Sequence, residues 1–242
     1  MKLAYIFIPF AYNGPCVTES GPKVMQFELT KRYGNKNMFL YELGWNESPS
    51  DYMSRVYENV LCLSKKYDRL IIFGGNHLSL LPVYQVADDL HFNSVTFDAH
   101  RDYIQSNGLI THASFLRYVK NHTSTKYILG FRDSIKKEDA YNFFDNEYSA
   151  SYLKSHDLNF CITKNIHFID IDVDFFDENV FPYTYCKKEN GFSMMDFEKI
   201  IHQIKLQDLK IISFSEYIQI NDVEKKGIEF IFQVMNQVLT KH

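Results

Sequence analysis

Short apolar runs alternate with stretches of helical periodicity along the whole chain. The apolar runs are rich in β-branched and aromatic residues and have the length of strands. They predict strands at 2–9, 37–42, 69–74, 93–98, 126–131, 166–174 and 209–214, with a weaker one near 158–162. The stretches between them predict helices at 22–33, 50–66, 78–89, 113–121, 134–146, 193–205 and 222–241.

This alternation indicates an α/β fold. Strands that alternate with helices are typical of a mostly parallel sheet with helices on both faces. We therefore expect a three-layer αβα architecture with about eight strands. The length of 242 residues suits one domain, and neither an internal repeat nor a linker interrupts it, so we expect a single domain over 1–242. In such sheets, ligands gather at the carboxyl ends of the strands.

Composition excludes several classes of function. The chain is 45% hydrophobic and 23% charged with a net charge of −4, and no run of Lys or Arg exceeds two residues. These values are ordinary for a soluble globular protein and argue against nucleic-acid or anionic-membrane binding. No apolar stretch approaches the roughly 20 residues of a membrane-spanning helix. The scattered cysteines form no C-x-x-C pair, so we expect reduced thiols and a cytoplasmic protein: Cys16, Cys62, Cys161 and Cys186.

Clusters of His and Asp follow three of the predicted strands. They read Gly-Gly-Asn-His at 74–77, Asp-Ala-His-Arg-Asp at 98–102, and Asp-Val-Asp-Phe-Phe-Asp at 172–177. Carboxylates and imidazoles together are ligands for divalent cations such as Mn²⁺, and an aspartate can bridge two of them. Three such clusters at the carboxyl ends of strands predict two cations side by side and a hydrolytic metalloenzyme.

Spacing supports this interpretation. In extended chain, residues two apart point to the same side, so Asp98, His100 and Asp102 are expected to face one site. Charges that emerge from an apolar strand are costly unless they are paired or metal-bound. His77 alone would be as well explained by a capping or core role; the recurrence of the pattern at three strand ends carries the argument.

The aspartates of 166–174 pose a separate question. Asp170, Asp172 and Asp174 alternate with Ile and Val, so their like charges would crowd one face and raise their pKa values. A cation removes that cost, whereas an exposed edge strand would leave the aspartates solvated. The pattern leaves open which of Asp170 and Asp174 is a ligand.

These motifs, in this order, resemble those of the arginase/agmatinase (ureohydrolase) family. That family carries Gly-Gly-Asp-His, Asp-Ala-His-x-Asp, a following His-Gly and Asp-x-Asp-x-x-Asp; here the third reads His112-Ala113. Weaker matches at 19–22 and 129–133 extend the resemblance over nearly the whole chain. It implies an arginase/deacetylase-like fold and a homo-oligomer, because relatives are often trimers or hexamers.

The resemblance also implies a ligand set and a reaction. By position, two Mn²⁺ ions (or other divalent metals) would be held by His77, Asp98, His100, Asp102, Asp172 and Asp174. In the family, a hydroxide between the metals attacks the carbon of a guanidinium and releases urea and a primary amine. Asp102 would accept a hydrogen bond from the hydroxide, and His112 would carry a proton to the leaving amine.

Three positions depart from the family pattern. Asn76 replaces an aspartate before the first histidine, and Ala113 replaces a glycine. Glu216 holds the aspartate place of the late Asp-x-x-Glu-x-Asn segment, but Gln219 holds that of the glutamate that pairs with the guanidinium. An amide there gives roughly half the strength of a carboxylate. Either the substrate differs, Glu216 or another residue binds it, or the alignment is shifted.

Several functions therefore stay open. The run 168–176, with Leu80-Leu81-Pro82 after His77, resembles arginase-fold proteins that include peptide arginases, which convert arginine side chains to ornithine. The substrate is then a small guanidino compound or an arginine-containing peptide. The alternatives are a metal-dependent hydrolase of another C–N bond, formimino or acyl amide, and a non-catalytic binding protein. The long loop 176–192 is expected to be functional, in a role the sequence does not name.

Overall fold

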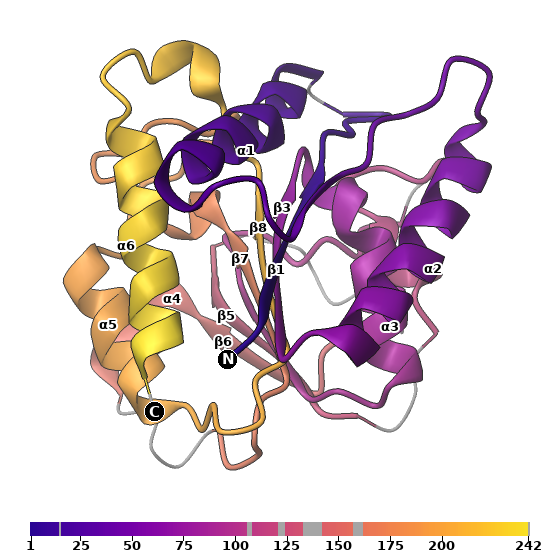
Figure 1. The fold of residues 1–242 in the computed structure, drawn as a ribbon. Helices are drawn as coiled ribbons and strands as arrows, with labels where there is room; N and C mark the ends of the chain where they lie inside the picture. The colour runs from indigo at the N-terminus through magenta and orange to yellow at the C-terminus, as the bar shows by residue number, and fades with distance from the viewer. Residues whose placement is uncertain (15, 106–107, 121–123, 133–141, 157–161, 242) are drawn as a thin grey trace.

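Eight parallel strands form one sheet in the order β2-β1-β3-β8-β7-β4-β5-β6 (Figure 1). The structure is a computed structural model that describes residues 1–14, 16–105, 108–120, 124–132, 142–156 and 162–241. The strands are β1 Leu3–Ile8, β2 Met38–Leu40, β3 Arg69–Gly74, β4 Ser94–Phe97, β5 Lys126–Phe131, β6 Asn146–Ser149, β7 Phe168–Asp172 and β8 Ile211–Ser215. The predicted α/β class and parallel sheet are confirmed.

Helices cover both faces of this sheet (Figure 1). They are α1 Ser20–Tyr33, α2 Pro49–Lys66, α3 Leu81–Asp89, α4 Ala150–Ser155, α5 Met194–Gln203 and α6 Lys226–Thr240. Helices α2 and α3 pack on one face, and α1, α4, α5 and α6 pack on the other. The helix starts follow from local sequence: Ser48 caps α2, with Pro49 at the first position, and Ser193 and Asp196 form a capping box on α5.

Strand β3 contributes to both apolar layers. In β3, Ile71 and Phe73 join the core beneath α1 and α6, whereas Leu70 and Ile72 join the core beneath α2 and α3. Successive side chains of a strand point to opposite faces, so a strand covered by helices on both faces supplies side chains to two layers. In β3 this gives a continuous apolar run, whereas β4 and β7 place the polar Thr96 and Asp170 on the face covered by α3.

Some predicted elements differ from those observed. Strand β6 and helix α4 were not predicted; the helix predicted at 134–146 lies mostly outside the described residues, and its last residue begins β6. The weak strand near 158–162 also lies almost wholly outside them. The stretch 78–89 divides into a 3₁₀ turn, His77–Leu80, and α3, because Pro82 fits only the first turn of a helix.

The strand order brings the three motifs together. Strand β8 lies between β3 and β7, and β4 is the next strand after β7. The clusters that follow β3, β4 and β7 therefore meet at the carboxyl ends of these central strands. Because β7 is central and Asp170 and Asp172 are buried, the exposed edge-strand interpretation is wrong. Among the described residues, no helix combines the length and apolarity needed to cross a membrane.

Candidate metal centre

Carboxylates from two strand ends surround one nitrogen of His77. The ring Nδ1 lies 2.8 Å from Asp102 Oδ2, 3.2 Å from Asp98 Oδ2 and 3.3 Å from Asp172 Oδ2. His77 begins the 3₁₀ turn after β3, Asp98 follows β4 directly, and Asp172 ends β7. His77, Asp98 and Asp102 thus form one group of metal-binding dimensions, with Asp172 beside His77.

A second group forms beside the first and shares one member with it. The Nδ1 atom of His100 lies 2.8 Å from Asp174 Oδ2 and 3.7 Å from Asp98 Oδ1. Asp98 therefore presents one oxygen to each histidine. Ligand atoms of His77, Asp98 and Asp102, and of Asp98, His100 and Asp174, form two overlapping clusters of metal-binding dimensions.

The segment 98–102 reaches this arrangement by turning, not by continuing as an extended chain. Strand β4 ends at Phe97, and Asp102 has a left-handed backbone with φ of 49°. As a result Asp98 and Asp102 face His77, while His100 faces Asp174. Left-handed backbone at a non-glycine residue is uncommon, and Asp is among the residues that adopt it most readily.

A buried contact outside the predicted set fixes that turn. Arg101 Nε donates to Glu147 Oε2 at 2.9 Å, and Tyr103 Oη donates to Glu147 Oε1 at 2.6 Å. Glu147 lies on β6, so its contribution depends on a strand that the sequence pattern does not predict. No local signal marks Glu147, because its partners are more than 40 positions away in the chain.

The glycine before Asn76 allows β3 to pass close to the β1 loop. A side-chain carbon on Gly75 would lie 2.4 Å from the backbone oxygen of Phe10. That distance is well inside van der Waals contact, so any larger residue would push His77 away from the aspartates.

Crowding of like charges marks the centre electrostatically. Burial first, and neighbouring carboxylates second, raise the pKa values of Asp98 and Asp172 well above 3.8. Burial alone would raise the pKa of Asp174 too, but the hydrogen bond and charge of His100 lower it. Burial alone would lower the pKa of His77, but the charge of Asp170 and the surrounding carboxylates raise it well above 6.5.

The residues fit a pair of divalent cations. Buried Nδ1 of His77 has no aligned hydrogen-bond partner, although three carboxylate oxygens lie within 3.3 Å of it. Positive charge at this position would offset the mutual repulsion of the carboxylates, which proteins otherwise avoid. Oxygen and imidazole donors suit Mn²⁺ and other divalent ions of its class.

Asp170 does not join the ligand cluster. It contacts Nε2 of His77 at 2.6 Å, which is the ring nitrogen opposite the one that faces the carboxylates. Asp174 instead follows β7 in the 3₁₀ turn Val173–Phe175 and faces His100. Between the two alternatives that the sequence left open, the geometry favours Asp174 as the ligand.

His112 lies beside the β1 loop and Asn76. A side-chain carbon on Gly14 would lie 2.3 Å from Asn76 Nδ2 and 3.0 Å from His112 Nδ1. The loop that carries His112 is joined to the 98–102 turn, because the backbone N of Leu116 donates to the backbone carbonyl oxygen of Asp102 at 3.2 Å. Neither Nδ1 of His112 nor Oδ1 of Asn76 has a hydrogen-bond partner among the described residues.

Glu216 is buried at the same edge of the sheet, after β8. Its Oε1 accepts a hydrogen bond from the backbone N of His77 at 3.3 Å, and its backbone is left-handed with φ of 66°. Burial, followed by the charges of Asp174 and Asp102, raises the pKa of Glu216 to about 7. Gln219 begins the 3₁₀ turn Gln219–Asn221 three residues later and is partly exposed.

Comparison with known proteins decides the family. The model of the arginase family matches residues 26–240. The chain belongs to the arginase family. In this arginase-family protein, a 155-residue segment is 24% identical to the agmatinase of Blochmanniella floridana and covers 60% of the chain and 50% of that relative. The chain thus spans about half the length of the curated relative that it matches.

Solved structures share the fold of this arginase-family protein over its full length. Arginase from Bacillus subtilis has a TM-score of 0.80 at 14% identity and covers 100% of this chain and 99% of its own. The formimidoylglutamase of the same species has 0.77 at 16%, covering 100% and 87%. Entamoeba histolytica arginase in complex with L-ornithine has 0.75 at 18%, covering 99% and 98%. The predicted arginase-like fold is confirmed.

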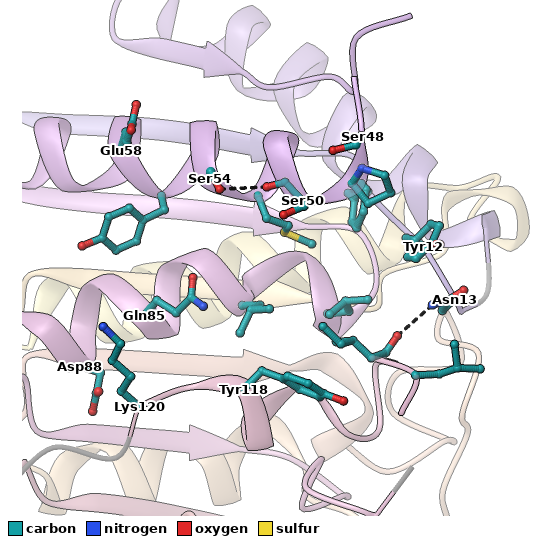
Figure 2. A pocket seen from close by; sticks show the side chains of 18 of the residues that line it. Tyr12, Asn13, Ser48, Ser50, Ser54, Glu58, Gln85, Asp88, Tyr118 and Lys120 are labelled. Atoms are coloured by element: carbon teal, nitrogen blue, oxygen red, sulfur yellow. Dashed lines mark hydrogen bonds between the residues drawn. The ribbon is translucent and has the colours of Figure 1, made fainter. Parts of the chain in front are cut away.

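A groove of about 960 Å³ lies between α2, α3 and the segment 108–120. Figure 2 shows Tyr12 and Asn13 at one end of it, and Glu58, Asp88 and Lys120 toward the other. The Asn13 side chain donates to the Ile110 oxygen at 3.0 Å and so links the two segments that form the end of the groove nearest Gly14. None of the predicted ligands lines this groove.

The loop 176–192 packs against the segment that follows β8. The backbone N of Ile218 donates to the Tyr183 oxygen at 2.8 Å, and Thr184 forms a bridge with Tyr217. Burial, followed by the charges of Glu216 and Asp174, raises the pKa of the half-buried Cys186 thiol to about 11.

Proposed function

We propose that this chain is a binuclear-metal amidinohydrolase that hydrolyses a guanidino group to urea and a primary amine, with 1–242 as one catalytic domain. The observation that carries the proposal is the shared position of Asp98 between His77 and His100. Two overlapping ligand groups with a common carboxylate are what two adjacent cations require. Membership of the arginase family supports the same reaction class.

In this proposal, two divalent cations, expected to be Mn²⁺, are held by the predicted ligand set. His77, Asp98, Asp102 and Asp172 would hold one, and His100 and Asp174, with Asp98 shared, the other. When bound, the pair would supply Lewis-acid charge and make water a stronger nucleophile at neutral pH.

Two residues of the chain would orient the water and transfer a proton. Asp102, whose Oδ2 lies 2.8 Å from His77 Nδ1, would accept a hydrogen bond from the attacking water. His112, whose Nδ1 has no hydrogen-bond partner among the described residues, would carry a proton to the leaving amine. The atoms balance as follows: a C–O bond forms between water and the guanidinium carbon, the C–N bond to the leaving nitrogen breaks, and both protons of the water end on that nitrogen, giving urea and a protonated primary amine.

The substrate end of the site differs from a standard guanidinium pocket. Gln219 offers an amide, which binds a guanidinium with roughly half the strength of a carboxylate. Glu216 is buried nearby, with one oxygen already accepting from His77 N. We propose that the two together orient the substrate, Gln219 by hydrogen bonding and Glu216 by charge.

The groove between α2 and α3 favours an arginine-containing peptide over a small guanidino compound. A volume of about 960 Å³ exceeds what a single small guanidino molecule occupies, and its Tyr12 end lies next to the loop that contacts His112. Flanking peptide residues in this groove would leave the arginine side chain at the metal centre. The product on the peptide would be ornithine.

The deciding experiment is urea release by the Mn²⁺-loaded protein. Arginine, agmatine and arginine-containing peptides are the substrates to compare, with D102N as the inactive variant and the exposed His202→Gln as a matched control. Urea from wild type and from H202Q, but not from D102N, would support the proposal. A Met53→Trp variant, which fills the groove, should raise KM for a peptide and leave KM for agmatine unchanged.

A second function is favoured by Gln219 alone. A neutral amide suits a formimino or acyl-amide group better than it suits a guanidinium, and a formimidoylglutamase shares the fold. Release of formamide or amine without urea would select this C–N hydrolase. A protein that binds two metals and hydrolyses neither class of substrate would instead be a non-catalytic descendant.

A further inference from the structure

Asp170 is a buried carboxylate that the proposed reaction does not use. It lies on the central strand β7, fully buried, with Thr96 of β4 and Ser213 of β8 as its register partners on either side. Residues paired across neighbouring strands share a face of the sheet. A polar row of three side chains therefore crosses an otherwise apolar layer of the core, below His77.

Hydrogen bonds satisfy this carboxylate from three directions. Ser213 Oγ donates to Oδ1 at 2.5 Å, Tyr84 Oη donates to Oδ2 at 2.7 Å, and His77 Nε2 lies 2.6 Å from the same Oδ2. Tyr84 comes from α3, so one strand row and one helix converge on a single group. Buried carboxylates are tolerated where such bonds compensate for lost hydration.

The direction of these hydrogen bonds is determined by chemistry. An ionised carboxylate only accepts, so Tyr84 must donate its single hydrogen to Asp170. Thr96 Oγ1, 2.7 Å from Tyr84 Oη, must then donate to the tyrosine. By the same argument Nε2 of His77 carries a hydrogen toward Asp170, so a cation among Asp98, Asp102 and Asp172 would take the place of the hydrogen on Nδ1 and accept its lone pair.

We propose that Asp170 is a positioning residue that fixes the ring orientation and tautomer of His77, so that its Nδ1 lone pair points at the cation between Asp98, Asp102 and Asp172. Tyr84 and Ser213 hold Asp170 in turn. The inference rests on the proposed function in one respect, namely that His77 is a metal ligand. It names a residue which that function leaves without a role.

The inference explains why a costly charge is kept in the core. A carboxylate behind a metal-bound histidine increases the basicity of the ring and fixes its direction, and losing such a partner typically weakens metal binding about 10- to 100-fold. The effect acts on the cation at His77 only, because His100 meets Asp174 and Asp98 through its own Nδ1. Loading should therefore be stepwise, with the His77 position filled first.

The test is Mn²⁺ titration of the metal-free protein by calorimetry. In D170A the tighter binding step should weaken about 10- to 100-fold while the other step is unchanged. In D170N the loss should be about 3- to 10-fold, because a neutral acceptor retains roughly half the strength of the bond to Nε2. Should D170A fail to fold, D170N alone carries the test.

A matched control removes a different buried carboxylate. Asp88, at the other end of α3, pairs with Lys126 at 3.1 Å and contacts no predicted ligand. D88N should change stability but leave both Mn²⁺ binding steps within about twofold of wild type, a range too small for a lost ligand partner. The contrast separates positioning of His77 from a general effect of disturbing the core beneath α3.

A second readout reports the tautomer itself. In protein labelled with ¹⁵N-histidine and loaded with diamagnetic Zn²⁺, the His77 resonance, assigned through its loss in H77Q, should show a protonated Nε2. A protonated Nδ1, or Mn²⁺ affinities of D170N and D170A equal to wild type, would overturn the inference and leave the amidinohydrolase proposal standing. Failure of wild type to bind Mn²⁺ would overturn both.

Discussion

The two halves of the candidate metal centre are built differently. The His77 half is fully enclosed: its imidazole is 0% exposed, carboxylates surround Nδ1, and Asp170 holds Nε2. The His100 half lies at the mouth: its imidazole is 27% exposed and faces Asp174 and Asp98. One half is fixed by the sheet core and the other by loops above it.

The difference indicates which half of the site is rigid and which half is accessible. Residues held by three strands and α3 can position a cation with little rearrangement, because a packed core tolerates few alternative geometries. In the open half, His100 is the predicted ligand that solvent and substrate can reach. We expect the enclosed half to bind its cation tightly and the open half to face the chemistry.

Removal of the shared ligand should produce the largest effect, because it disables both halves of the centre at once. Asp98→Ala deprives both halves of an oxygen, so both cations should be lost and activity should fall by roughly 10³-fold or more, equivalent to several kcal/mol of stabilisation. Metal content by elemental analysis and the rate of urea release measure this. Asp177→Asn is the control, because Asp177 belongs to the same motif but bonds Asn179 N and Gly191 N instead. Retention of both metals by D98A would contradict the shared-ligand geometry.

Substitutions of the two histidines test the enclosed half and the open half separately. His77→Ala removes the enclosed ligand, so the tight cation should be lost, at a cost above about 100-fold in affinity. His100→Ala should weaken only the looser cation. Calorimetric Mn²⁺ titration of the two variants should give one surviving step in each, and it should be a different step. Identical titrations would mean that the halves are not independent.

Gly14→Ala tests a group outside both halves. The new methyl group would collide with Asn76 and His112, so turnover should fall about 10- to 100-fold from misplacement of the proton carrier. Both Mn²⁺ sites should stay filled, because neither ligand cluster contacts Gly14. Steady-state kinetics with metal analysis on the same preparation separates the two effects. Loss of metal in G14A would assign Asn76 and His112 to the centre itself.

The smallest effect concerns pH and the exposed half. Burial opposes protonation of His100, but the hydrogen bond and charge of Asp174 raise its pKa from 6.5 to about 10 in the metal-free protein. A raised folded-state pKa gives stability that is complete below about 6.5 and is lost as pH rises through about 10. The Tm gap between wild type and His100→Gln, with EDTA present, should therefore shrink between these pH values, by about 2–4 °C for each kcal/mol lost. A gap that is constant with pH, as expected for the exposed His202→Gln, would exclude the His100–Asp174 pair.

Most of the fold could be predicted because its signals are local. Seven of the strands are evident as apolar runs, and the caps at Ser48 and Ser193 mark helix starts within a few residues. Strand β6 could not be predicted, because its sequence, Asn-Glu-Tyr-Ser, is polar. It is the outermost strand of the sheet and pairs with β5 only, so it can be less apolar than a central strand. Pairing with β5 made it a strand, and that pairing is not local.

The candidate site, like the fold, has parts that local sequence predicts and parts that it does not. The strand-end motifs contain all the members of the two ligand clusters, because His and Asp after buried strands are informative by themselves. The partners that hold them could not be predicted, since Glu147, Tyr84 and Ser213 are ordinary residues until folding places them beside a ligand. Sequence spacing also predicted an extended 98–102 segment, whereas a left-handed turn at Asp102 divides its side chains between the two halves.

The sequence by itself thus determined the class of fold, the family resemblance and the chemistry of the ligands, because these depend on residue type and on periods of two and 3.6. Only the tertiary structure decided that Asp170 stands behind His77 while Asp174 faces His100, although all three aspartates of that segment have the same spacing. The physical reason is where β7 ends: Asp170 lies within the sheet and is bound by its neighbours, and Asp174 lies beyond it in a turn.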